Sequence, residues 1–97
     1  MPKGYIYAEV AVFDALRYEH WRYRVVESIA KAGGRFIVRR GDPQVLAGHN
    51  KQMPLVFIVE FESRERAHEW YRSELPLMDY LGTAARLDVV LLTGEGE

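Results

Sequence analysis

A single carboxylate interrupts the most apolar segment of the chain. The stretch from Leu55 to Glu62 is nearly continuous in aliphatic and aromatic residues, yet it contains Glu60. A carboxylate in such a segment is unfavourable unless a cation or a hydrogen-bond donor accompanies it. Arg39 and Arg35, on the preceding predicted strand, are the candidate cations. We therefore predict a catalytic pair in which Glu60 acts as a general base and Arg39 grips an acid or enolate with two hydrogen bonds.

The same charges have a structural interpretation. Ion pairs that only hold a fold together also place charged groups in protected positions, and they perturb those groups as an active site does. Glu60 and its arginine partner could therefore form a network at a strand end or between subunits. The residue types alone leave both interpretations open.

Two aromatic residues complete the predicted pocket. Tyr7 lies on the face of the first predicted strand that is not expected to enter the core, where a buried hydroxyl would need a partner. Trp70 follows on a predicted helix, where the usual role of a tryptophan is to pack the helix on a sheet. The predicted ligand-binding residues are Tyr7, Arg39, Glu60 and Trp70.

The sequence predicts neither a metal site nor a cofactor. The chain has no cysteine, and its three histidines (His20, His49 and His68) do not show the spacings of a metal-binding motif. Ser63 has no histidine at a suitable spacing, so we interpret it as a helix cap and not as a nucleophile. Any chemistry would therefore be carried by carboxylate, guanidinium and hydroxyl groups.

Composition excludes several classes of function. The chain has 97 residues, of which 48% are apolar and 28% charged, so we expect a single domain over residues 1–97. The net charge is −1, which gives no electrostatic field to hold nucleic acid or an anionic membrane surface.

No segment has the length and hydrophobicity to cross a membrane. The N-terminal residues resemble a strand and not a signal peptide, so we expect a cytoplasmic protein.

Apolar periodicity defines the elements that would position these side chains. Apolar residues alternate with others from Tyr5 to Val12, as in a strand. Spacings of three and four residues follow the capping residue Asp14 and end at Gly33-Gly34, as in a helix. The other predicted elements are strands at Arg35 to Arg40, Leu55 to Glu62 and Arg86 to Thr93, a loop at 42–53, a helix after Ser63, and a segment at 74–85 whose structure stays open.

The order β-α-β-β-α-β predicts an α+β fold of the ferredoxin-like kind, with an antiparallel sheet whose helices cover one face. The helix-facing residues would be Ile6, Ala8, Val10, Val12, Phe36, Val38, Leu55, Phe57, Val59 and Phe61. The bare face would carry Tyr5, Tyr7, Glu9, Arg35, Ile37, Arg39, Val56, Ile58 and Glu60. Because an uncovered face with this much apolar area favours association, we expect a homodimer that packs sheet on sheet as a dimeric α/β barrel.

With these residues in view, the chain resembles the bacterial family of unknown function DUF1330, in the dimeric α/β-barrel superfamily. The resemblance rests on PKGYIYAEV, Gly33-Gly34-Arg35, Arg39-Arg40-Gly41, Val45-Leu46-Ala47-Gly48, and Glu60-Phe61-Glu62-Ser63 followed by Ala67, Trp70-Tyr71 and Ser73. The chain departs from the family pattern at Pro76, where a tyrosine is usual, and at Leu81, where a basic residue is usual. The resemblance implies the fold and the dimer, and it implies no reaction.

Two functions remain in contention. The first is a small dimeric binding protein or cofactor-free enzyme, which would take a planar apolar molecule bearing a carbonyl or carboxylate group. Its pocket would lie between the sheet and the helices, partly closed by the 42–53 loop. The alternative is a non-catalytic dimerisation or interaction module, in which the charged residues are structural.

Overall fold

The computed structural model describes residues 2–41, 43–48 and 55–95. In chain order its elements are β1 (Gly4–Val12), α1 (Ala15–Lys31), β2 (Arg35–Val38), β3 (Leu55–Phe61), α2 (Arg64–Ser73), α3 (Leu75–Leu81), the short 3-10 helix η1 (Gly82–Ala84) and β4 (Ala85–Thr93). Among the described residues, no helix is long and apolar enough to cross a membrane.

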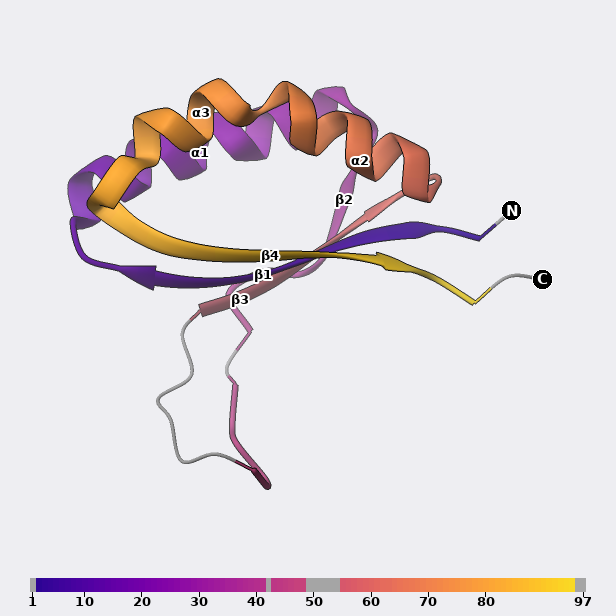
Figure 1. Cartoon of the computed structure of the whole chain (residues 1–97), viewed down its shortest axis with the longest axis horizontal. Helices are drawn as coiled ribbons and strands as arrows, with labels where there is room; N and C mark the ends of the chain where they lie inside the picture. The colour runs from indigo at the N-terminus through magenta and orange to yellow at the C-terminus, as the bar shows by residue number, and fades with distance from the viewer. Residues whose placement is uncertain (1, 42, 49–54, 96–97) are drawn as a thin grey trace.

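The four strands form one antiparallel sheet in the order β2-β3-β1-β4. Figure 1 shows α1, α2 and α3 together on one side of this sheet. The predicted α+β, ferredoxin-like fold is confirmed, with the first and third strands at the centre. The other face of the sheet carries no helix, and we call it the open face.

Capping residues fix where the two long helices begin. The side chain of Asp14 accepts a hydrogen bond from the Arg17 N–H, and that of Ser63 accepts one from the Arg66 N–H. After α1, Gly33 has a φ of 80°, a left-handed conformation that glycine adopts without steric penalty. The chain can therefore turn directly from α1 into β2.

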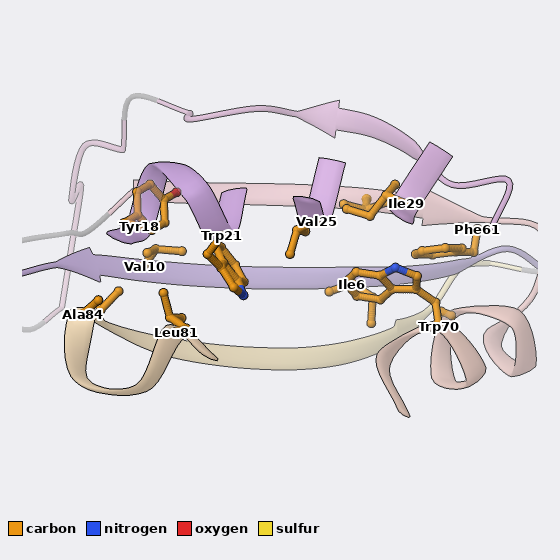
Figure 2. Packing of buried hydrophobic residues seen from close by; sticks show 13 residues of the cluster. Ile6, Val10, Tyr18, Trp21, Val25, Ile29, Phe61, Trp70, Leu81 and Ala84 are labelled. Carbon is orange, nitrogen blue, oxygen red and sulfur yellow. The ribbon is translucent and has the colours of Figure 1, made fainter. Parts of the chain in front are cut away.

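The core lies between the sheet and the helices, as the alternation of apolar residues predicts. Ile6, Ala8 and Val10 of β1 are buried beneath the helices, and so are Val59 and Phe61 of β3. From the helices come Tyr18, Trp21, Val25, Ile29, Ala67, Trp70 and Leu81. Figure 2 shows these side chains meeting in one layer.

Strand β2 differs from its prediction because its register shifts by one residue. Arg35 lies opposite Glu60 and Phe36 opposite Val59, but Val38 lies opposite Ile58. Since opposite residues share a face, the shift moves Val38 to the open face and ends the strand at Val38 instead of Arg40. Val38 was therefore wrongly assigned to the helix-facing set.

Residues 74–85, whose secondary structure the sequence did not determine, fold as α3 followed by η1 and the start of β4. Pro76 lies in the first turn of α3, where a missing N–H costs no helical hydrogen bond. Leu81 is buried in the core between the helices and the sheet. The structure thus settles a segment that the sequence left undecided, and α3 completes the helix layer beside α1.

The connection between β2 and β3 departs from its predicted role where it is described. Residues 43–48 extend away from the sheet on the side opposite the helices (Figure 1), and Leu46 is 88% exposed. They therefore do not close a pocket between sheet and helices. The rest of the predicted loop, residues 42 and 49–53, lies outside the described residues.

Candidate functional site

Glu60 lies on the open face at the end of β3, where two side chains hold its carboxylate. The Arg35 guanidinium donates to Glu60 Oε1 at 3.0 Å, and the Tyr5 hydroxyl donates to Oε2 at 3.1 Å. The strand pairing places all three side by side, because Glu60 lies opposite both Tyr5 on β1 and Arg35 on β2. Each carboxylate oxygen therefore has a donor within the subunit.

This arrangement keeps Glu60 ionised. The hydrogen bond from Arg35 is the largest effect on the pKa of Glu60 and lowers it. Burial, the second-largest effect, opposes this, and the hydrogen bond from Tyr5 lowers the pKa further. The pKa of Tyr5 is raised, first by burial and then by its bond to Glu60. A general base works best when its pKa lies near the working pH. Because the pKa of Glu60 is lowered instead, we interpret Glu60 as the ion-pair partner of Arg35 and not as a base.

Tyr7 lies on the same open face, two residues from Tyr5 along β1. Its hydroxyl donates to Glu9 Oε2 at 2.9 Å, and this bond is the largest cause of its raised pKa. Tyr7 lies opposite Ile58 on one side and Val90 on the other. The residue therefore belongs to an apolar and tyrosine-rich strip at the middle of the open face.

Arg39 lies away from Glu60, on the helix side of the sheet. Its guanidinium is 4.3 Å from the ring centroid of Phe36, which faces the helices. The register shift in β2 is the physical reason, because it reverses the faces of the residues that follow Phe36. The expectation that Arg39 shares a face with Glu60 is therefore wrong, and Arg35 takes that place.

Trp70 packs in the core of the subunit. Its ring centroid is 5.6 Å from that of Phe61, and its indole N–H donates to Ser28 Oγ on α1 at 2.7 Å. The hydrogen bond joins α2 to α1 across the helix layer. Of the predicted ligand-binding residues, the structure places Arg39 and Trp70 on the helix side and Tyr7 and Glu60 on the open face, so the predicted pocket is not formed as a unit.

A cavity lies instead between α1 and the strands β2 and β3. It has room of about 40 Å³ for water-sized molecules, and we call it the arginine cavity. Its lining residues are Tyr18, Trp21, Arg22, Val25, Val26, Phe36, Arg39, Arg40 and Phe57. Aromatic rings form its inner wall, and its three arginines form the polar part of its rim.

The arginines of this rim differ in their pairing. Arg22 donates to Glu19 Oε1 at 2.9 Å, one turn away on α1. Within the described part of the chain, neither Arg39 nor Arg40 forms an ion pair. Arg40 also has a left-handed φ of 70°, an uncommon conformation for a residue with a side chain. Among the described residues, two guanidinium groups without a close ion-pair partner therefore stand at the mouth of an apolar cavity, and the charge of Arg40 also contributes to lowering the pKa of Glu19.

Comparison with known proteins now gives the family. A family model described as a domain of unknown function, DUF1330, matches residues 3–95. The chain belongs to the DUF1330 family. A search of the curated proteins found no match to the sequence of this DUF1330 chain.

Solved structures share the fold of the DUF1330 chain at low identity. RPA0582, a protein of unknown function from Rhodopseudomonas palustris, is 15% identical, with a TM-score of 0.73 over 99% of this chain and 85% of that one. SnoaB, a cofactor-independent oxygenase from Streptomyces nogalater, is 15% identical, with a TM-score of 0.66 over 100% and 97% of the two chains. A dimeric ferredoxin-like protein from an uncultured marine organism is 15% identical, with a TM-score of 0.56 over 100% and 99%. Such likeness shows a shared fold and not a shared reaction.

Sequence reasoning missed most of the arginine cavity of this DUF1330 chain. Trp21 fits the helical spacing that follows Asp14, and it is buried, but that spacing does not show that one side of its ring borders a cavity. Arg40 was expected to be the last residue of a strand, whereas the strand ends at Val38. Gly41, directly after Arg40, was the available signal, because glycine often marks a turn.

Proposed function

We propose that the chain is a homodimeric protein that binds a small, flat, apolar molecule bearing a carboxylate or carbonyl group in the arginine cavity. The observation that carries this proposal is the position of two guanidinium groups, Arg39 and Arg40, beside an aromatic wall, neither of them in a close ion pair with another described residue. Guanidinium groups bind carboxylates with two parallel hydrogen bonds, and aromatic walls bind flat apolar bodies. Whether the bound molecule is also converted is a separate question, and the catalytic roles of Glu60 and Arg39 stay predictions.

The electrostatics of the rim support an anionic ligand. The Arg39 guanidinium lies over the Phe36 ring, 4.3 Å from its centroid, a contact that holds the group without neutralising its charge. Arg22 is already bound to Glu19, so it adds less attraction than the other two. An incoming carboxylate would therefore meet Arg39 and Arg40 while its apolar part entered between Trp21, Phe36 and Phe57.

The homodimer forms part of the same proposal. Open-face residues of β4 are only half-covered, with Val90 47% and Leu92 43% exposed, and the apolar strip continues onto β1 and β3. A second copy packed against this face would cover the strip, while the helix side, with its arginine cavity, would remain accessible. In the alternative function, an interaction module, the charged residues are structural. Only Glu60 supports this alternative, because Arg35 and Tyr5 donate hydrogen bonds to its carboxylate.

Isothermal titration with cinnamate and cinnamamide tests the proposed site. These probes share a slender apolar body and differ in charge, so we expect cinnamate to bind more tightly. Arg39→Gln should weaken cinnamate binding about ten- to a hundredfold, the usual loss of a charge-assisted hydrogen bond. Arg35→Gln, on the open face, is the matched control and should leave binding unchanged. Equal binding of the two probes, or equal losses in both variants, would exclude the arginine cavity as the anion site.

A further inference from the structure

Tyr18 of α1 packs its ring in the core and also lines the arginine cavity. The residue is 5% exposed, and its ring centroid lies 5.7 Å from that of Trp21. It borders the cavity together with Arg22 and Arg40. Figure 2 shows the Tyr18 oxygen at the end of the ring that points towards β3, the strand whose Phe57 lines the same cavity. The helical spacing along α1 predicts the packing of the ring and says nothing of the hydroxyl.

The charges of the cavity rim act on the Tyr18 hydroxyl. Burial raises the pKa of Tyr18 most, and the positive charges of Arg22 and Arg40 oppose this rise. The hydroxyl therefore lies within the electrostatic reach of two arginines of the rim. Because the pKa is raised overall, the phenol keeps its proton at neutral pH and can donate a hydrogen bond.

The Tyr18 hydroxyl forms no hydrogen bond within the described residues. The hydroxyls of Tyr5 and Tyr7 differ, because each donates to a carboxylate. A tyrosine as deeply buried as Tyr18 normally has a hydrogen-bond partner for its hydroxyl. Positive charge at the rim favours an acceptor oxygen over a further donor, so the partner that fits this position is an oxygen supplied from outside the chain.

The unpartnered N–H of Trp21 faces a different space. A smaller cavity with room of about 10 Å³, which we call the central cavity, shares Trp21 and Phe57 with the arginine cavity and is also lined by Leu87 and Val89 of β4. Figure 2 shows the Trp21 nitrogen directed towards β4, away from the Tyr18 oxygen. The polar part of a ligand at the rim of the arginine cavity would therefore meet Tyr18 and not the Trp21 N–H.

We propose that Tyr18 is a further binding residue of the arginine cavity, an inference that rests on the proposed function. Its hydroxyl donates a hydrogen bond to the ligand group that Arg39 and Arg40 attract. Guanidinium groups respond to the charge of that group, whereas a neutral hydroxyl donates to a carboxylate or to an uncharged carbonyl. The ligand class is then a flat acid that binds most tightly, with its neutral carbonyl counterpart as a weaker ligand held by Tyr18.

Tyr18→Phe tests this role, because it removes the hydroxyl and keeps the ring that packs in the core. Isothermal titration should show cinnamate and cinnamamide each bound about two- to tenfold more weakly, the usual loss of one hydrogen bond. Arg39→Gln should instead weaken cinnamate binding much more than cinnamamide binding. Since the hydroxyl has no partner within the described residues, Tyr18→Phe should not lower the midpoint of urea unfolding. The matched control is Tyr23→Phe, also on α1, where the tyrosine is 74% exposed.

Each outcome decides the inference. If Arg39→Gln weakens cinnamate binding and Tyr18→Phe changes neither affinity, the arginine cavity stands and the role of Tyr18 is refuted. A loss of affinity that comes with a lower unfolding midpoint, or that Tyr23→Phe reproduces, also refutes it. Failure of cinnamamide to bind the wild type, or a loss confined to cinnamate, refutes the donation to a neutral carbonyl. If cinnamate itself does not bind, the proposed function fails and the role of Tyr18 fails with it.

Discussion

Glu60 shows how an unusual residue can be fully accounted for by its neighbours. Arg35 and Tyr5 each supply one hydrogen bond to its carboxylate, from the strands on either side. Because Arg35 lowers the pKa of Glu60 below its ordinary value of 4.5, the ionised carboxylate stabilises the folded state. This stabilisation is complete above the ordinary pKa and is lost as the pH falls through the lowered one.

We therefore predict that Glu60→Gln lowers the Tm at pH 7. The difference from wild type should shrink as the pH falls below the ordinary pKa of a glutamate, about 4.5, and should be lost once the pH lies below the lowered pKa of Glu60 in the folded state. Thermal unfolding followed by circular dichroism from about pH 3 to 7 measures this difference. The control is Glu69→Gln on the exposed side of α2. A Tm difference that stays constant with pH would contradict the ionised-carboxylate account.

The bond between Trp70 and Ser28 gives a second prediction at this scale. Ser28→Ala leaves the indole N–H of a nearly buried tryptophan without an acceptor, so it should destabilise the fold by about 1–3 kcal/mol. Urea unfolding of Ser28→Ala, Trp70→Phe and the double variant measures the coupling between the two side chains. Additive effects would mean that the bond contributes little. Thr83→Ala, at an exposed position in η1, is the control.

Two phenylalanines of β3, Phe57 and Phe61, differ in how deeply they are buried, although the alternation along the strand predicts both to face the helices. Phe61 is 1% exposed, whereas Phe57 is only partly buried and borders both the arginine and central cavities. The cost of a truncation depends on how much packing it removes. The sequence predicts a buried residue at both positions, because alternation along a strand gives the face but not the depth.

We expect Phe61→Ala to cost about 3–5 kcal/mol and Phe57→Ala at least about 1 kcal/mol less. Chemical denaturation of both variants under the same conditions gives the two values. Equal costs would mean that Phe57 is packed as tightly as Phe61, and the cavities beside it would then be filled by side-chain movement in solution.

The elements could be predicted from the sequence because their signals are local. Caps at Asp14 and Ser63, the turn at Gly33-Gly34 and the alternation in β1 each depend on a few adjacent residues. The register shift in β2 has no such signal, since it is set by how β2 pairs with a strand further along the chain. The shift moved Arg39 to the helix side, and Trp70 packs in the core on that side too, so the predicted pocket combined residues from both faces of the sheet.

The whole subunit has one covered and one uncovered face, and this asymmetry gives a prediction about assembly. Val90→Lys places a charge in the apolar strip of the open face, opposite Tyr7, where a second copy would bury it. We expect the wild type to be dimeric at micromolar concentration and Val90→Lys to be monomeric, as measured by light scattering after size exclusion.

A charge of the same kind on the helix side is the control. Leu75 in α3 is 49% exposed, so Leu75→Lys should leave the dimer intact. A monomeric wild type, or a dimer that survives Val90→Lys with its fold unchanged, would exclude the sheet-on-sheet arrangement.

The register shift in β2 also bears on how residues should be compared between relatives. A relative of the same length that pairs this strand without the shift would keep its arginine in an alignment, yet display it on the open face. The same aligned residue would then lie on the sheet face that a second copy would cover in one protein, and on the helix face in another. For this edge strand, the pairing register says more about the role of an arginine than its identity does, and an alignment without gaps can conceal a change of face.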